Sequence, residues 1–254
     1  MIARLRADWP RVDLLVNNAG VLAGGELHHN DGESARSVID INLGGTLLGC
    51  HAVVPWLIES RHAAQQPRSA RGVPRPGVVN IASIFAELAP PGFAAYNASK
   101  AGVVTLSESL RGELQPHGLN VTVALPGVTP TGLFERATFA TSELREVAER
   151  YQSGAELTAG RVADAVLDAA ARGRRRVVVG ARARRYAWLL RIFRDQTLSR
   201  VAAKTRAEFG LPAAAPASQN GAAQPPSQPT TTNAAANRQR IPAPDHATPA
   251  EQDR

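Results

Sequence analysis

The sequence predicts an α/β domain built on a parallel β-sheet, and two observations carry this prediction. Between Val12 and Gly180, short apolar runs alternate with longer segments in which apolar residues recur at helical spacing. The chain of 254 residues, 44% of them hydrophobic, is also long enough to bury a sizeable core. We therefore expect one globular domain in this part of the chain.

Four short apolar runs are the expected strands. They are DLLVNNAG at 13–20, GVVNIAS at 77–83, NVTVALPG at 120–127 and RRVVVG at 175–180. Buried runs of this kind, separated by helical segments, are typical of a parallel sheet.

Three helices are expected between these strands. The segment 33–60 carries apolar residues at helical spacing, the segment 96–118 ends at Gly118, and a shorter helix covers about 160–172. Residues 61–77 are rich in Arg, Gln, Ser, Pro and Gly without periodicity, which predicts an exposed loop.

The rest of the chain divides into two further parts after a domain at 1–180. Residues 181–210 are expected to form a basic, helical extension of the domain. Within it, the segment 182–209 is amphipathic, because its apolar residues fall near one face of the helix and its arginines fall elsewhere. The apolar positions are Tyr186, Leu189, Leu190, Phe193, Leu198 and Val201. Residues 211–254 are dominated by Ala, Pro, Gln, Ser and Thr, which predicts a disordered tail.

The formal net charge of +7 is concentrated between Arg172 and Arg206. A solvated arginine face is the commoner explanation of such a segment, and peripheral contact of 182–209 with an anionic membrane surface is the alternative. We expect no nucleic-acid partner.

Other features of the sequence favour a cytoplasmic protein without a metal site. Cys50 is the single cysteine, which excludes an internal disulfide and fits a reducing compartment. The first residues are charged throughout, unlike a secretory segment, and no window approaches the roughly 18 apolar residues of a membrane span. No cluster of metal ligands stands out.

Tyr96 and Lys100 in YNASK are four residues apart on a predicted helix, so their side chains lie on one face. A phenol of ordinary pKa is a poor base at neutral pH, and a fixed positive neighbour lowers its pKa. Tyr96 can then exchange a proton with an alcohol or a ketone. An exposed helical pair without function is the alternative for these two residues taken alone.

Ser83 closes the strand VVNIAS thirteen residues before Tyr96, at the carboxyl end of a strand, where open α/β sheets bind ligands. The motifs DLLVNNAG, DINLGG, VVNIAS, YNASK and LPGVTPTG occur in order. In the order and approximate spacing of these motifs, residues 1–180 resemble the short-chain dehydrogenase/reductase family. The resemblance implies an incomplete doubly wound, Rossmann-type sheet in three αβα layers.

The resemblance also implies roles for four catalytic residues. Tyr96 would be the general acid or base, Lys100 would lower its pKa and bind the nicotinamide ribose, and Ser83 would hold the substrate oxygen. Asn42 in DINLGG would support a water that links Lys100 to solvent. If each residue is considered alone, the alternative for Ser83 is a turn at the end of the strand, and the alternative for Asn42 is a helix kink or a local cap.

The implied cofactor is NAD or NADP, without a preference between them. Tyr96 and Lys100 would bind it together with residues of two loops, one beside the adenosine half and one where Thr131 would bind the carboxamide. The loop residues are Asn18, Ala19, Gly20, Pro126, Gly127, Thr129 and Thr131.

The sequence departs from the family at its start, because the family's first βαβ unit carries a T-G-x-x-x-G-x-G loop for the pyrophosphate and the sequence has no G-x-x-x-G-x-G. Its absence would leave DLLV at the edge of the sheet. The alternatives are an incomplete record of a longer protein and a true short form that binds cofactor poorly. We favour the first.

We therefore expect an oxidoreductase that transfers hydride between a nicotinamide cofactor and a small secondary alcohol or ketone. The alternative is a noncatalytic remnant used for dimerisation or surface binding. The resemblance further implies a homo-oligomer through the helices near 33–60 and 96–116. Four apolar residues after Thr131 suggest a substrate cavity or core packing, and these are Leu133, Phe134, Phe139 and Leu144.

Overall fold

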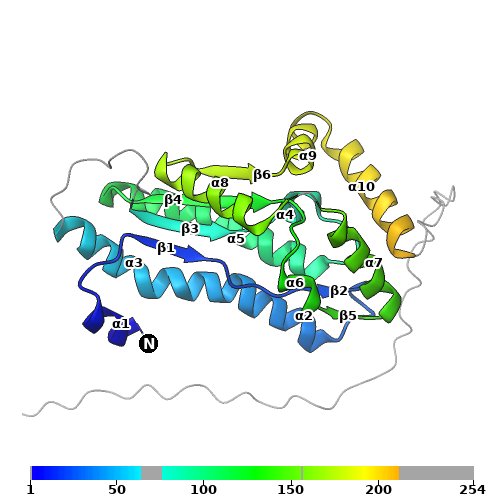
Figure 1. The fold of residues 1–254 in the computed structure, drawn as a ribbon, viewed down its shortest axis with the longest axis horizontal. Coiled ribbons are helices and arrows are strands. Elements are labelled where there is room, and N and C mark those ends of the chain that lie inside the picture. The colour runs from blue at the N-terminus through cyan, green and yellow to red at the C-terminus, as the bar shows by residue number, and fades with distance from the viewer. Residues whose placement is uncertain (1, 64–75, 156, 212–254) are drawn as a thin grey trace, which may run out of the picture. The chain divides into compact units, whose positions relative to one another are not determined.

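The computed structural model describes residues 2–63, 76–155 and 157–211 of the chain. Its main sheet has four parallel strands in the order β1-β3-β4-β6 (Figure 1). The strands are β1 (Leu14–Asn17), β3 (Gly77–Ile81), β4 (Asn120–Pro126) and β6 (Arg176–Val179). Each lies within a run predicted as a strand, so the predicted parallel α/β sheet is confirmed.

The two central strands are buried on both faces, which explains their continuous apolar sequences. Val78 and Val79 on β3 and Val121 and Val123 on β4 are almost completely removed from solvent. β-Branched side chains pack well on such a pleated surface. By contrast, β1 has one strand neighbour among the described residues, and its Val16 is exposed, as expected of an edge strand.

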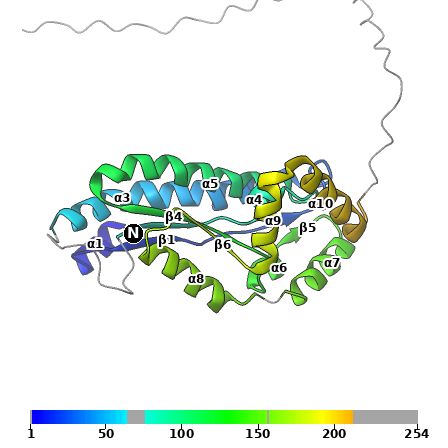
Figure 2. The ribbon, with the colours of Figure 1, turned by 90° about the horizontal axis from the view of Figure 1, so that it is seen from above.

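Helices cover both faces of this sheet (Figure 2). On one face lie α3 (Gly45–Ala63) and α5 (Ala94–Leu114), and on the other lies α8 (Ala159–Ala171). Figure 2 shows the strands between these two layers. The expected helices at 96–118 and 160–172 are therefore present, with small shifts at their ends.

The predicted helix at 33–60 is a continuous run of three helical segments. It begins as α2 (Gly32–Ile39), passes through a π-helical turn at Asp40–Gly44 and continues as α3 to Ala63. The first residues of the loop predicted at 61–77 are thus helical, while 64–75 lie outside the described residues.

Side chains and glycine mark the ends of these helices. The Asp31 carboxylate accepts hydrogen bonds from the first turn of α2, which lowers its pKa, and Thr158 caps α8. After α5, a short 3-10 turn at Gln115–His117 ends at Gly118, whose φ of 67° is left-handed. The prediction that Gly118 stops this helix is confirmed.

By length and composition, the helical run Gly32–Ala63 could cross a membrane, since it contains an 18-residue window of mean hydropathy 1.4. We expected from the sequence that no segment would be apolar enough over about 18 residues to span a membrane, and this expectation was wrong. The run packs within the domain instead, because Cys50, Val53 and Leu57 on α3 are buried in one core cluster with residues of β3 and β4. We assign it as a core helix.

Several short elements were not predicted from the sequence. They are α4 (Phe85–Leu88), α6 (Gly132–Glu135), α7 (Ser142–Ser153) and a second parallel sheet of β2 (Ala23–Gly24) and β5 (Thr138–Phe139), whereas α1 (Ile2–Asp8) is the helix before β1. Strands of two residues are too short to show periodicity.

The basic segment at 182–209 forms two helices. They are α9 (Ala181–Ile192) and α10 (Arg194–Phe209), and they meet at Phe193, whose backbone (φ −130°, ψ 56°) is not helical. Tyr186 and the buried Leu190 pack with α4, as expected of the apolar face, whereas Phe193 is exposed. This extension belongs to one compact unit, Met1–Ala214, with the preceding domain, and the tail predicted at 211–254 lies outside the described residues after Leu211.

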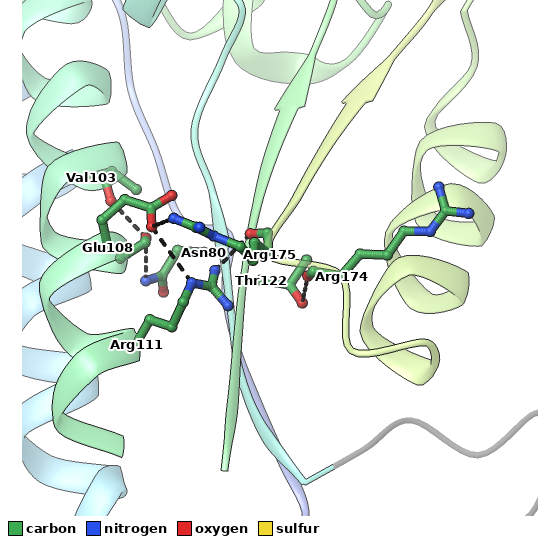
Figure 3. A network of polar contacts seen from close by, with 8 residues as sticks. Asn80, Val103, Glu108, Arg111, Thr122, Arg174 and Arg175 are labelled. Atoms are coloured by element: carbon green, nitrogen blue, oxygen red, sulfur yellow. Dashed lines mark hydrogen bonds and ion pairs between the residues drawn. The ribbon is translucent and has the colours of Figure 1, made fainter. Parts of the chain in front are cut away.

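Polar contacts fix α5 against the sheet (Figure 3). The fully buried Asn80 on β3 accepts a hydrogen bond from Asn17 on β1 (2.8 Å) and donates one to Ser107 on α5 (2.9 Å). Farther along α5, Glu108 pairs with Arg175 before β6 at 2.7 Å. One network is buried and the other is exposed.

We expect the buried network to contribute more stability than the exposed one. Asn80→Ala leaves the Asn17 amide without its oxygen acceptor and should lower the free energy of unfolding by about 1–3 kcal/mol. Glu108→Gln is the control and should cost less than about 1 kcal/mol, because an exposed ion pair is weak. Urea denaturation measures both, and a larger loss for Glu108→Gln would contradict this assignment.

Candidate active site

A cavity of about 520 Å³ lies at the carboxyl ends of β1, β3 and β4. Ser83 after β3 lines it together with Tyr96 and Lys100 on α5, so the structure brings these predicted residues together. This is the edge at which open parallel sheets bind ligands. The cavity extends to Val16 on the exposed edge strand β1.

Tyr96 is buried with its hydroxyl in contact with Ser83. A hydrogen bond links the two side chains, and the Phe85 ring packs edge-on against the Tyr96 ring at 6.2 Å. Burial raises the pKa of Tyr96 to about 12, and the hydrogen bond with Ser83 opposes part of this effect. Ser83 Oγ also accepts a hydrogen bond from the Phe85 amide, so the expected strand-end turn is present beside the contact with Tyr96.

Lys100 is only 5% exposed, and its ammonium group donates a hydrogen bond to the Ile81 carbonyl at the end of β3 (2.9 Å). Burial lowers the pKa of Lys100 to about 8. Lys100 Nζ lies over the Tyr96 ring, 5.8 Å from its centre. The pKa of Tyr96 is thus raised by burial and not lowered, contrary to the expectation for a phenol beside Lys100.

Asn42 lies in the π-helical turn between α2 and α3 and is fully buried. Its amide forms a pair of hydrogen bonds with the Val21 backbone (2.8 and 3.0 Å) and donates to Ser99 Oγ (3.0 Å), which in turn donates to the Tyr96 carbonyl. Asn42 therefore connects the loop after β1 to the helix that carries Tyr96. It does not line the cavity, and its role in a proton relay stays a prediction.

The residues predicted to bind a cofactor gather around the same cavity. Six of the seven loop residues line it, namely Asn18, Gly20, Pro126, Gly127, Thr129 and Thr131, whereas Ala19 does not. A Cβ atom on Gly20 would lie 3.2 Å from Asn42 Oδ1 and 3.5 Å from Lys100 Nζ. The glycine thus leaves open the space in front of Lys100. Thr131 also caps α6 through its side chain.

The apolar residues predicted to form a substrate cavity divide into two groups. Leu133 and Phe134 line the cavity, but Phe139 lies in β5 and neither it nor Leu144 reaches the cavity. Several further residues line the cavity without having been predicted from the sequence, and these are Leu22, Phe85, Arg136, Val162, Val166 and Leu167. The spacing of the last three along α8 is helical, which is a signal that the sequence did contain.

Glu26, His28 and His29 form a group that was not expected from the sequence. Their ligand-capable atoms lie within 4.8 Å of one another at the surface. Exposed groups of this kind are common without a metal, and these residues do not line the cavity.

The family follows from comparison with known proteins. Residues 1–140 match the family model described as short chain dehydrogenase, which is more than half of the chain. The protein therefore belongs to the short-chain dehydrogenase family, as the motifs at Ser83 and Tyr96 predicted.

Two relatives with curated names illustrate the level of similarity. SadH of Mycobacterium tuberculosis, an oxidoreductase by name, is 30% identical over 190 residues, which make up 73% of this chain and 64% of SadH. The 2-(R)-hydroxypropyl-CoM dehydrogenase of Xanthobacter autotrophicus is 32% identical over 170 residues, 65% of this chain and 62% of that enzyme. The matches thus span less than two thirds of either relative.

Solved structures show the same Rossmann-like fold. A short chain dehydrogenase from Burkholderia cenocepacia in complex with NADP aligns with a TM-score of 0.63 and 28% identity, covering 79% of this chain and 73% of that one. A short chain dehydrogenase/reductase from Burkholderia phymatum in complex with NAD aligns with a TM-score of 0.63 and 25% identity, covering 75% and 70%.

Because the Lys100 ammonium is buried, we expect the difference in stability between the parent protein and Lys100→Met to depend on pH. A folded-state pKa of about 8, below the ordinary 10.5, means that the folded protein loses this proton first, so stability rises between pH 8 and 10.5. The free energy of unfolding of the parent relative to Lys100→Met should therefore increase over this range by up to roughly 3 kcal/mol. Loss of the hydrogen bond to Ile81 does not depend on pH and cancels in this comparison.

Denaturation in urea across this pH range provides the measurement. The chain has only one other lysine, Lys204, whose side chain is half exposed, so Lys204→Met is the matched control. A difference between parent and Lys100→Met that stays constant with pH would show that the Lys100 ammonium is not buried.

Proposed function

We propose that the protein is an NAD(P)-dependent oxidoreductase that transfers hydride between the cofactor and a secondary alcohol or ketone. The observation that carries this proposal is the contact of the Tyr96 and Ser83 hydroxyls in one cavity with the Lys100 ammonium. The NADP and NAD complexes of the two similar Burkholderia structures support the choice of cofactor.

The residues of this chain fit a nicotinamide cofactor. Gly20 keeps the approach to Lys100 open, and a Cβ atom there would press on Asn42. Asn18 lies on one side of the cavity, and Thr129 and Thr131 supply hydroxyl groups from the loop after β4. Such a cofactor, when bound, supplies the hydride donor or acceptor.

The side chains of the site would transfer the proton that the substrate oxygen gains or loses in this reaction. During reduction of a ketone, the Tyr96 hydroxyl gives its proton to the ketone oxygen as hydride reaches the carbon, and during oxidation of a secondary alcohol the Tyr96 phenolate takes the hydroxyl proton as the C–H hydride leaves. Ser83 donates a hydrogen bond that holds the substrate oxygen beside Tyr96. The positive charge of Lys100 lies near the phenol and, when Tyr96 loses its proton, opposes the larger effect of burial on the phenolate.

The substrate that fits this cavity is largely apolar. Leu22, Phe85 and Leu133 line it near Tyr96, and Val162 and Val166 close it from α8. Apolar walls with a few polar groups at the reacting end are typical of small-molecule sites.

Hydride transfer is tested with the purified chain, either NAD or NADP, and a panel of apolar secondary alcohols and ketones. We expect tight cofactor binding by calorimetry and a change in nicotinamide absorbance that depends on the substrate. Failure to bind either cofactor would favour the noncatalytic alternative and overturn the proposal.

Tyr96→Phe tests the role of the phenol. It keeps the packing of the ring against Phe85 and removes only the hydroxyl, so turnover should fall by roughly 10² to 10⁴ while the fold persists. Steady-state kinetics and circular dichroism measure the two effects. Normal turnover in this variant would remove Tyr96 from the mechanism.

We also propose that the protein self-associates through α3 and α5. On α3, Leu48 is 63% exposed and Leu47 is exposed beside it, although the opposite side of this helix already packs in the core through Val53 and Leu57. A helix that is apolar on both sides is typically buried on both. A second copy of the chain can cover the outer side.

Sedimentation velocity at micromolar concentration tests this assembly. The parent should sediment as a dimer or larger species, and Leu48→Glu should shift it toward the monomer, since a charge is costly in an apolar interface. Leu27→Glu, at an exposed leucine outside the helices, should leave the species unchanged. A parent that is strictly monomeric would contradict the proposal.

A further inference from the structure

The corner where α9 meets α10 exposes three large apolar side chains. Trp188 is 57% exposed, Ile192 54% and Phe193 49%. Trp188 and Ile192 are four residues apart on α9 and therefore share one face of the helix. Figure 1 shows this corner beyond the carboxyl end of β6, at the periphery of the domain.

These three side chains are not the ones through which α9 packs on the domain. The inner face of α9 is already used, because Ala183 and Leu190 are buried with Ile84 and Leu88. The exposed apolar group therefore forms a second, outward face of the same helix. We call it, with its surrounding arginines, the α9 patch.

Arginines surround these side chains in the α9 patch. They are Arg182, Arg184, Arg185, Arg191 and Arg194. All five are exposed, and Asp195 is the sole acidic residue between 181 and 195. Arg184 and Arg191 lie four residues before and three residues after Trp188, on its face of the helix.

The charges of the α9 patch are also uncompensated within the part of the chain that the structure describes. None of the five arginines forms an ion pair there, whereas arginines elsewhere on the surface commonly face a carboxylate. Arg36 with Asp40 and Arg172 with Asp168 are examples. The patch thus combines apolar side chains with free positive charge.

We propose that the α9 patch docks on the surface of an anionic lipid bilayer. Trp188 is suited to the boundary between headgroups and acyl chains, and Ile192 and Phe193 add apolar area that such a boundary buries. The arginines meet the negative headgroups, and their aliphatic stems can lie along the same boundary.

Other occupants fit the patch less well. A second copy of the chain bound through the same patch would bring two sets of five arginines together, which repel each other. A nucleic acid would satisfy the arginines but gives Ile192 no apolar environment. An anionic bilayer satisfies both parts of the surface.

Vesicle binding tests the proposal with point variants of the full chain, because α10 packs into the core through Phe209 against Phe93 and cannot be removed without uncovering it. The protein should cosediment with vesicles of phosphatidylcholine mixed with phosphatidylserine more than with phosphatidylcholine alone. Binding should weaken as salt is added. Equal binding to both vesicles would overturn the proposal.

The charge component is tested by a pair of double variants that each remove two positive charges. Arg184→Gln with Arg191→Gln should weaken binding to the phosphatidylserine vesicles by about tenfold or more. Arg36→Gln with Arg172→Gln is the matched control and should bind within about twofold of the parent, since screening limits the effect of distant charges. Equal losses in both pairs would show a nonspecific charge effect and overturn the proposal.

The apolar component is tested at the tryptophans. Trp188→Ala should weaken vesicle binding, whereas Trp9→Ala, at an exposed tryptophan after α1, should not. Vesicles should shift the tryptophan emission of the parent to the blue, and Trp188→Phe should lose this shift. Vesicle binding that does not depend on Trp188, or a patch that binds single-stranded DNA but no vesicle, would overturn the proposal.

Discussion

The burial of the Lys100 ammonium is the constraint on which the rest of the site depends. A charged group that is 5% exposed needs a partner, and the Ile81 carbonyl at the end of β3 provides it at 2.9 Å. This hydrogen bond fixes one turn of α5 against the end of a strand. Tyr96 lies one turn earlier on the same helix and is thereby held beside Ser83.

Two buried amides hold α5 where this contact requires it. Asn80 ties the middle of the helix to the strands through Ser107, and Asn42 ties its first turns to the loop after β1 through Ser99. Networks of this kind are stable only when every polar group has a partner, which makes the position of α5 well defined. Burial of the Lys100 ammonium is unfavourable, and the packing of the rest of the domain offsets this free energy. As a result, a positive charge is held at a fixed position near the phenol of Tyr96.

The sequence predicted the regular elements better than the contacts between them. The four strands and the two long helices followed from apolar periodicity, and Ser83, Tyr96 and Lys100 were identified from motif order. The partner of Lys100 is a backbone carbonyl, which leaves no mark in the sequence. The exposure of Phe193 was missed because a nonhelical backbone at one residue redirects α10, and the apolar pattern continues across that break.

The pKa of Lys100 is the most direct measure of this account. The chain has two lysines, so a protein labelled with ¹³C at lysine Cε gives two NMR signals, and the one absent from Lys100→Met belongs to Lys100. We predict that this signal titrates with a midpoint near pH 8, because burial disfavours the ammonium. A midpoint at or above the ordinary 10.5 would contradict a buried Lys100 and the arrangement of the site that depends on it.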